Sequence, residues 1–499
     1  MASERQQFSS KYGFIISAVG SAVGLGNIWR FPYVTYDNGG GAFLVAYFIA
    51  FLTAAIPILI LEYAIGTKYR GATPLSIARM NNKWEFVGWI PTIISGIIIF
   101  YYSVILSWAM NYTRFAVDKS WGEDTASFFF NEFLKMSDSP LNLGSINWPV
   151  ALGLFVIWGS AYYFCSKRID KGVEMLNKVL NPLMFLLVII ITIRGITLVG
   201  AVDGLNVLFT PDWLQLARPS VWIAAYGHVF FSCSVAMGIM ITYSSYLPKK
   251  SEIVNTSFIT CFTNSFVEII CAIAVFSILG YMALAQQMPV TEVAASGVGL
   301  TFIAFPVGIN FMGGVGIIFG ILFFICLVFA GYTSFISLLE AFSAPFIEKF
   351  NISRKKIFAI TCSGGFIASL LFATGAGLVA LDMVDYVVNN YGLTLVGILQ
   401  AILCAWVVKN LPELQAHANA ASYFKVGAWW VICVKYVVPI AIAANLLSAG
   451  WGFITEGYDG YPASALWVYC GGTVLTIIVS VIVLTKVKWR TPIDEYEKD

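Results

Sequence analysis

Long apolar runs separated by short polar segments dominate the pattern along this chain. Twelve runs approach or exceed the ~20 residues that an α-helix needs to cross a membrane. An open sheet would leave backbone groups unpaired in hydrocarbon, and a barrel would show short alternating strands. The pattern therefore predicts an all-α polytopic membrane protein with 12 transmembrane helices. We place them at 12–34, 42–66, 86–113, 148–165, 173–196, 220–246, 254–284, 312–346, 357–374, 378–408, 426–454 and 466–487.

Composition agrees with a chain embedded in a lipid bilayer. Of the 499 residues 59% are hydrophobic and 11% charged, and the mean hydropathy is +0.80. The formal net charge of +2 offers no basic face for nucleic acid, so we expect no nucleic-acid partner. Lysine and arginine concentrate in the N-terminal segment and in every second loop after it, which predicts that both termini are cytoplasmic. We expect one membrane domain over 1–499, multi-pass in the inner (plasma) membrane.

Two spans carry residues that weaken a membrane helix. The first contains Gly24, Gly26, Asn27 and Arg30. Glycines in such a helix can simply allow close packing, but a charged residue inside a span usually faces a cavity or a partner. The sixth span contains small polar residues within 230–238. Serines there could merely bond their own backbone.

The positions of these two interruptions suggest an internal symmetry. They lie five helices apart, and because five is odd, the second set of five helices starts from the opposite side of the membrane. We therefore expect an inverted 5+5 repeat with broken helices 1 and 6, formed by 12–196 and 220–408, followed by helices 11 and 12 in 426–487. Paired interruptions of this kind point to a transporter's central binding site, where unwound backbone offers N–H groups to an anion and carbonyls to cations.

Several motifs in these spans resemble the neurotransmitter:sodium symporter family, and the resemblance covers nearly the whole chain in one register. It implies a prokaryotic, amino-acid-transporting member, similar to the bacterial leucine transporters of that family. The implied function is a sodium-coupled secondary active symporter that imports a neutral, apolar α-amino acid by alternating access. The motifs are Gly24-Leu-Gly-Asn-Ile-Trp-Arg-Phe-Pro32, Asn38-Gly-Gly-Gly-Ala-Phe43, Glu62, the run from Phe230 to Gly238, Asn264, and Ala330-Gly-Tyr-Thr-Ser334.

The resemblance further implies two Na⁺ ions held by neutral oxygen atoms, the ligand type that hard cations prefer. The first ion would lie among the substrate carboxylate, Ala22, Asn27, Ser232 and Asn264. The second would lie among the carbonyls of Gly20, Val23 and Ala330 and the hydroxyls of Thr333 and Ser334.

Gly24 indicates the substrate class. Family members that carry monoamines are similar but hold an aspartate at this position, whereas Gly24 leaves neighbouring backbone amides free for an α-carboxylate. The resemblance assigns carboxylate binding to Gly24, Leu25, Gly26 and Tyr102, and amine binding to Ala22, Phe231, Ser232 and Ser234. It assigns the side-chain pocket to Ile98, Phe231, Met237, Phe335 and Leu338.

Charges near the helix ends match the family's gates. Arg30 and Asp385 would pair on the extracellular side, above an aromatic lid formed by Tyr102 and Phe231. On the cytoplasmic side the inner gate would be formed by Arg5, Tyr246 and Glu348.

Glu268 bears on whether transport requires chloride. It lies four residues after Asn264, so both face one side of the seventh span. Chloride-dependent members have a serine at the matching position and bind chloride with neighbours matching Tyr47, His228, Ser232 and Asn264. A carboxylate fixed at this position implies that transport does not require chloride. Once sodium has left, Glu268 could return in its protonated form, so proton counter-transport is left open. His228 stands where the family usually has glutamine. Both a neutral buried histidine and a proton-linked role remain open for it.

The main alternative is an amino-acid-gated channel or sensor on the same fold. An enzyme is not expected, because the two histidines, His228 and His417, belong to no His-Glu-x-x-His motif and Gly-x-Ser-x-Gly is absent. The nine cysteines lie in or beside apolar spans, which argues against structural disulfides and a cysteine zinc site. The identity of the amino acid and the oligomeric state are left open.

Overall fold

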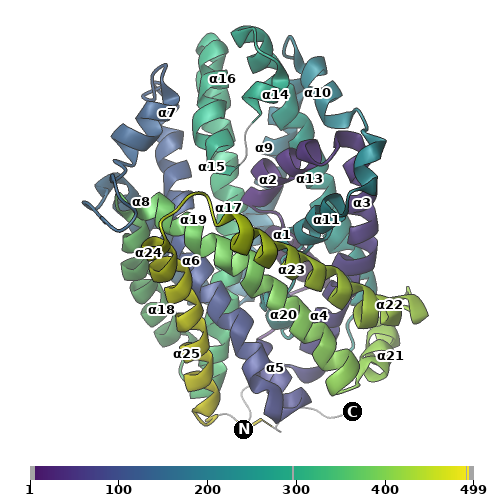
Figure 1. Ribbon diagram of the computed structural model, residues 1–499. Coiled ribbons are helices and arrows are strands. Elements are labelled where there is room, and N and C mark those ends of the chain that lie inside the picture. Colours follow the sequence, from purple (N-terminus) through teal and green to yellow (C-terminus); the bar gives the residue numbers. More distant parts are fainter. Residues whose placement is uncertain (1–5, 295–296, 491, 494–499) are drawn as a thin grey trace.

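The computed structural model describes residues 6–294, 297–490 and 492–493, and every regular element in those ranges is a helix (Figure 1). The first half contains α1 (Lys11–Ala22), α2 (Leu25–Asp37), α3 (Phe43–Ala50), α4 (Ile56–Tyr69), α5 (Thr73–Met80), α6 (Glu85–Phe115), α7 (Thr125–Ser127), α8 (Trp148–Cys165), α9 (Met175–Ile196), α10 (Ala201–Phe209), α11 (Pro219–Ser232) and α12 (Ile239–Ser244). The second half contains α13 (Val254–Gln286), α14 (Val290–Val293), α15 (Gly297–Gly299), α16 (Phe305–Phe311), α17 (Gly313–Phe350), α18 (Arg354–Ser369), α19 (Gly377–Val387), α20 (Thr394–Ile402), α21 (Leu411–Ala421), α22 (Ala428–Ile432), α23 (Val438–Glu456), α24 (Ala463–Leu466) and α25 (Gly472–Lys486).

Short turns of 3-10 or π-helix join some of these elements into longer rods. A π-helical turn at Phe51–Ala55 connects α3 to α4, and another at Val388–Leu393, called η9, connects α19 to α20. Ten rods in the described ranges are long and apolar enough to cross a membrane, and the pair α1 and α2, bent by 54°, raises the number to eleven. The polytopic helical architecture is therefore confirmed.

The predicted spans agree with the observed rods to within a few residues. The spans 86–113, 254–284 and 378–408 correspond to Asn82–Phe115, Val254–Gln286 and Gly377–Val407. The sixth predicted span, 220–246, is present as α11 and α12, which residues 233–238 separate. The count of 12 spans and the inverted repeat stay predictions.

Short helices in the connecting segments were not predicted. Figure 1 shows α7, α10, α14 and α16 gathered at one end of the bundle, with α5 and α21 at the other. These segments are too short or too polar to stand out as apolar runs, and packing on the longer helices stabilises them. The end with α5 and α21 is the one predicted to be cytoplasmic, a sidedness that stays a prediction.

The two broken spans are held by backbone-close packing on intact helices. A Cβ atom at Gly20 of α1 would lie 2.3 Å from the Asn181 side chain of α9, and one at Gly66 of α4 would lie 2.3 Å from the Ile241 carbonyl of α12. The Asn181 amide also donates to the Ile16 carbonyl of α1 at 2.7 Å. Glycine at these two positions therefore lets the broken helices approach the surrounding frame, which fixes where their unwound segments lie.

Candidate functional site

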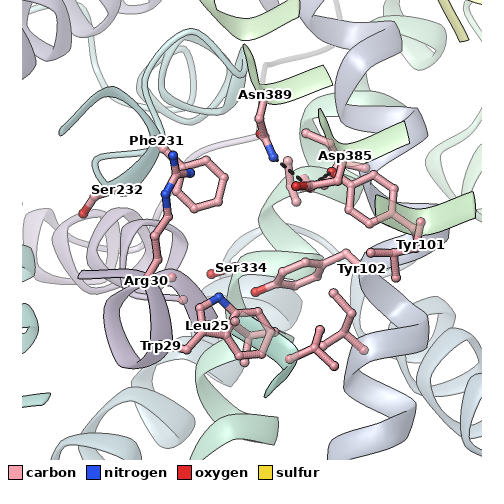
Figure 2. A pocket seen from close by; sticks show the side chains of 18 of the residues that line it. Leu25, Trp29, Arg30, Tyr101, Tyr102, Phe231, Ser232, Ser334, Asp385 and Asn389 are labelled. Atoms are coloured by element: carbon pink, nitrogen blue, oxygen red, sulfur yellow. Dashed lines mark hydrogen bonds between the residues drawn. The ribbon is translucent and has the colours of Figure 1, made fainter. Parts of the chain in front are cut away.

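A cavity of about 490 Å³ lies where both broken spans unwind, between α1, α2, α6, α11 and α17 (Figure 2). It extends to Asp459 and Tyr461 in the loop before α24. Its inner part is formed by eleven of the twelve predicted substrate residues: Ala22, Gly24, Leu25, Gly26, Ile98, Tyr102, Phe231, Ser232, Ser234, Met237 and Leu338.

Phe335 is the exception, and its assignment to the pocket is corrected here. Its side chain is fully buried outside the cavity lining, and its ring meets the Trp158 ring of α8 edge-on at 5.0 Å. Successive residues of an α-helix are rotated by about 100°, so Phe335 faces α8 while its neighbour Ser334 faces α1. Phe335 supports the helix packing behind the pocket and does not trim the pocket itself.

The break between α1 and α2 exposes the start of a helix to the cavity. Val23 and Gly24 have extended backbone, and the Gly24 amide donates to Asn27 Oδ1 at 2.8 Å. The next amides, beginning at Leu25, lie in the first turn of α2, where N–H groups lack helical partners and carry partial positive charge. A Cβ atom at Gly24 would lie 3.0 Å from Ser334 Oγ and 3.4 Å from the Tyr102 hydroxyl. Glycine therefore keeps open the space in front of these amides.

The break between α11 and α12 contains three residues with left-handed backbone. Ser234, Ala236 and Gly238 have φ values of 51°, 63° and 73°. Such conformations cost of order 1–3 kcal/mol each for residues other than glycine and persist where the surroundings impose them. The Ser234 hydroxyl donates to the Ser21 carbonyl at 2.9 Å, so this unwound segment is tied to the last turn of α1.

Side chains from intact helices take the place of the missing helical hydrogen bonds. Glu62 of α4 accepts the Ala236 amide at 2.9 Å, and Ser95 of α6 donates to the Met237 carbonyl at 2.8 Å. Sequence reasoning quoted Glu62 only as part of a motif and gave it no role. The available signal was a lone acid within an apolar span, which usually meets a specific partner.

The residues predicted for the first sodium ion form one hydrogen-bonded chain. Asn27 Nδ2 donates to Asn264 Oδ1 at 2.8 Å, and Asn264 Nδ2 donates to Ser232 Oγ at 2.5 Å. The Ser232 hydroxyl then donates to Glu268 Oε1 at 2.6 Å. All four side chains are buried, and Ala22 lies beside them in the cavity wall. Their neutral oxygen atoms fit a sodium ion, with Glu268 as a neighbouring negative charge.

Glu268 is the centre of a buried polar cluster. The Tyr47 hydroxyl donates to Glu268 Oε2 at 2.5 Å, and His228 Nε2 lies 2.8 Å from Oε1. His228 Nδ1 has no hydrogen-bond partner among the described residues. His228 therefore meets Glu268 through Nε2, which donates when the ring carries a hydrogen on that nitrogen.

The residues predicted for the second sodium ion also converge. Ser334 Oγ lies 3.4 Å from the Gly20 carbonyl oxygen, 3.3 Å from that of Val23 and 3.3 Å from that of Ala330. The Thr333 hydroxyl donates to the Ala330 carbonyl at 3.0 Å. Five uncharged oxygen atoms from α1, its unwound end and α17 are thus gathered in one place, as a small alkali cation requires.

The expected pair on the outer side is not formed. Asp385 Oδ1 accepts hydrogen bonds from the Tyr101 hydroxyl and Asn389 Nδ2, both at 2.7 Å (Figure 2). The Arg30 guanidinium instead lies 4.9 Å from the centroid of the Phe231 ring, and no ion pair joins it to Asp385 in the described part of the chain. The two predicted gate residues therefore both line the cavity without pairing with each other.

The expected inner gate is partly outside the described residues. Arg5 is one of the residues not described. Tyr246 donates from its hydroxyl to Glu340 Oε1 at 2.7 Å, and Glu348 accepts the Ala72 amide at 3.0 Å. Tyr246 and Glu348 thus engage different elements of the same end of the bundle.

Sequence reasoning missed the ion pair at the centre of this end. Arg354 of α18 donates to both carboxylate oxygens of Glu340, at 2.7 and 2.5 Å, and the Glu340 side chain is fully buried. The signal that could have identified it was an acid within the eighth apolar span. Nearby, Lys11 donates to Glu252, a contact that lowers the pKa of this loop carboxyl below its usual value.

Known proteins share both the sequence and the fold. The family model described as "Sodium:neurotransmitter symporter family" matches residues 5–125 and 116–491. An uncharacterised sodium-dependent transporter of Methanocaldococcus jannaschii is 37% identical over 487 residues, covering 97% of this chain and 98% of the relative. The human sodium- and chloride-dependent GABA transporter 2 is 31% identical over 490 residues, covering 89% and 80%.

A solved structure matches as well. The crystal structure of MhsT in complex with L-phenylalanine superimposes with a TM-score of 0.76 at 30% sequence identity, covering 89% of this chain and all of that one. The matched family and relatives are transporters, not enzymes, and they confirm the resemblance seen in the first and sixth spans. The chain therefore belongs to the sodium:neurotransmitter symporter family.

Proposed function

We propose that the protein couples the inward movement of two sodium ions to the import of a neutral, apolar α-amino acid by alternating access, without a need for chloride. The observation that carries the proposal is the cavity floor at Gly24, where the first amides of α2, which have no helical partners, and the first sodium group meet. An α-carboxylate placed there would neutralise the positive end of α2 and complete the oxygen ligands of the ion.

The wall chemistry supports an apolar substrate side chain. Ile98, Met237 and Leu338 line the inner cavity, and the charged lining residues, Arg30, Asp382, Asp385 and Asp459, belong to other segments of the wall. A charged substrate side chain would therefore lose its hydration at the floor without gaining a partner. The bound L-phenylalanine in MhsT supports an amino-acid substrate for this chain too.

Two sodium ions would supply a large driving force. A tenfold gradient is worth ~1.4 kcal/mol per ion, and a potential of 100 mV adds ~2.3 kcal/mol per charge. For two ions the sum is about 7.4 kcal/mol, which limits accumulation of a neutral zwitterion to roughly 10⁵-fold.

Glu268 supports independence from chloride, because its carboxylate already supplies a negative charge beside the first sodium group. Proton counter-transport through the same carboxylate belongs to this proposal as its optional part. For the location we propose the inner (plasma) membrane with both termini in the cytoplasm, supported by the basic loops and by the position of α5 and α21.

The test is uptake of radiolabelled amino acids into proteoliposomes that contain the purified full-length protein. We expect accumulation above the external concentration when sodium is outside, its loss when potassium or choline replaces sodium, and competition by apolar amino acids among the twenty. Saturable flux without accumulation would support the alternative, an amino-acid-gated channel or sensor.

A matched pair of glycine variants tests the floor. Gly24→Asp should abolish uptake, because the new carboxylate lies where the substrate's own carboxylate binds. Gly299→Asp is the control, since it adds the same charge to the cavity wall at a position where a Cβ atom meets nothing within 4 Å. Equal loss in both variants would contradict the proposed role of Gly24.

A further inference from the structure

A second cavity, of about 210 Å³, opens beside the first and is lined by α11, η9, α20 and α23. It shares Arg30, Phe231 and Asn389 with the main cavity. Its polar lining consists of Arg30, Tyr226, Asn389, Asn390, Thr394 and Asn445. We call it the side cavity.

Arg30 is the one charged residue among the described residues that line the side cavity. Its guanidinium forms no hydrogen bond or ion pair within the described residues and rests on the Phe231 ring. A guanidinium keeps its charge at any physiological pH. An unpaired charge inside a membrane protein is costly unless a counter-ion or water compensates it. The described lining of the side cavity contains no carboxylate, and Asp385, across the main cavity, acts on Arg30 electrostatically without forming an ion pair with it. On the side-cavity face the guanidinium is therefore open to an added anion.

The amides of the side cavity have donors to spare. Asn390 Nδ2 donates to the Tyr386 carbonyl at 3.0 Å, and Asn445 Nδ2 donates to the Ala441 carbonyl at 3.3 Å. Each amide nitrogen carries two hydrogens, so one N–H of each remains available. Together with the guanidinium these groups can donate to an anion.

We propose that the side cavity binds a small monovalent anion, a halide or a short carboxylate, while the main cavity is open to the outside. A zwitterionic amino acid is disfavoured, because the lining offers no carboxylate to its ammonium group. The site is distinct from Glu268, which lies on α13 and is absent from the lining. It requires neither the proposed substrate nor the proposed independence from chloride.

The anion would oppose closure of the outer side. Asp385 accepts hydrogen bonds from Tyr101 and Asn389 in this structure. Closure would bring Asp385 to Arg30, where its carboxylate would take the place of the bound anion. An anion bound to Arg30 must leave before that pair can form, so small anions should stabilise the open form and slow uptake. The expected slowing is about twofold to fivefold, the range for one charged contact that remains partly hydrated.

The site is tested directly by diffraction from substrate-free crystals soaked in sodium bromide, recorded at the bromine absorption edge. We expect anomalous density in the side cavity beside Arg30. Crystals of the Asn445→Leu variant should show less of it. Absence of density beside Arg30 in the wild-type protein would overturn the proposal.

A labelling experiment measures the effect on closure. All nine native cysteines are buried, so a cysteine introduced by Leu378→Cys in the outer part of the main cavity can report its opening to a thiol reagent. With sodium and substrate present, chloride, bromide or acetate should raise the labelling rate relative to the bulky sulfonate HEPES as the only anion. Additional alanine, which is a zwitterion, should not raise the labelling rate.

When Asn445→Leu is combined with Leu378→Cys, small anions should no longer raise the labelling rate. Asn206→Leu, an exposed asparagine of α10 outside both cavities, should retain the anion effect. An anion effect of equal size in Asn445→Leu would show that the anions act elsewhere and would overturn the proposal.

Discussion

Replacing Glu268 by serine should make uptake respond to chloride, if the proposed independence of the wild-type protein from chloride rests on this carboxylate. The wild-type carboxylate accepts hydrogen bonds from Tyr47, Ser232 and His228, and its side chain is fully buried. Serine removes the negative charge and also leaves a space lined by these three donors. A chloride ion entering that space would receive the same hydrogen bonds that the carboxylate receives.

The geometry sets the size of the effect. Ser232 Oγ lies 2.6 Å from Glu268 Oε1, so a sodium ion held by that hydroxyl would lie near the carboxylate. At a separation of about 5 Å and an effective dielectric constant of about 20, the attraction is about 3 kcal/mol, or roughly 100- to 300-fold in sodium affinity. Without chloride the sodium concentration for half-maximal uptake should rise by a factor of this order. Saturating chloride should restore most of it.

The assay measures the sodium dependence of initial uptake in proteoliposomes, with chloride or HEPES as the anion. Glu268→Gln is the matched control, because it removes the charge but fills the space, so its weakened sodium affinity should not recover in chloride. Wild-type sodium affinity of Glu268→Ser in the absence of chloride would refute the reasoning. Equal recovery of both variants in chloride would also refute it.

Three further variants, one of them a double substitution, have defined outcomes. Thr333→Ala combined with Ser334→Ala should abolish uptake but leave the melting temperature nearly unchanged, since the second sodium loses both hydroxyls, and near-normal sodium affinity would place that ion elsewhere. Phe335→Ser should destabilise the protein by about 3 kcal/mol, as for other truncated core phenylalanines. Its competition profile should match that of the wild type, and a changed profile would return Phe335 to the pocket. Glu340→Gln should cost about 3 kcal/mol, because it leaves the buried Arg354 guanidinium without its charge partner, and thermal unfolding in detergent measures the loss.

The helix positions were accessible from the sequence because membrane insertion depends on local composition. The prediction of 254–284 differs by only two residues from α13, since a run of apolar side chains is itself the physical cause of the span. The break in the first span was accessible for a similar reason. Gly24 and Gly26 weaken the helix there, and Asn27 supplies a side-chain bond to the free Gly24 amide.

The sequence did not reveal features that depend on the direction in which a side chain leaves its helix, or on contacts between distant segments. Phe335 follows Ser334 directly, yet the two face different neighbours, and a residue's place in a motif carries no information on that rotation. The pairing of Glu340 with Arg354 crosses the end of α17 and required the packed structure. The separation of Arg30 from Asp385 depends on how α2 and α19 are placed relative to each other, which the local sequence does not determine.

The hydrogen bond from the Ala236 amide to Glu62 has a consequence for how this site would respond to heavy water. An amide outside any helix normally exchanges its hydrogen rapidly, because nothing protects it between rare openings. The Ala236 amide lies in an unwound segment yet is fully buried and donates to a carboxylate at 2.9 Å. Its exchange should be as slow as that of core helical amides. Deuterium uptake at this one position would therefore report when the hydrogen bond to Glu62 breaks, that is, when the unwound segment after α11 separates from α4.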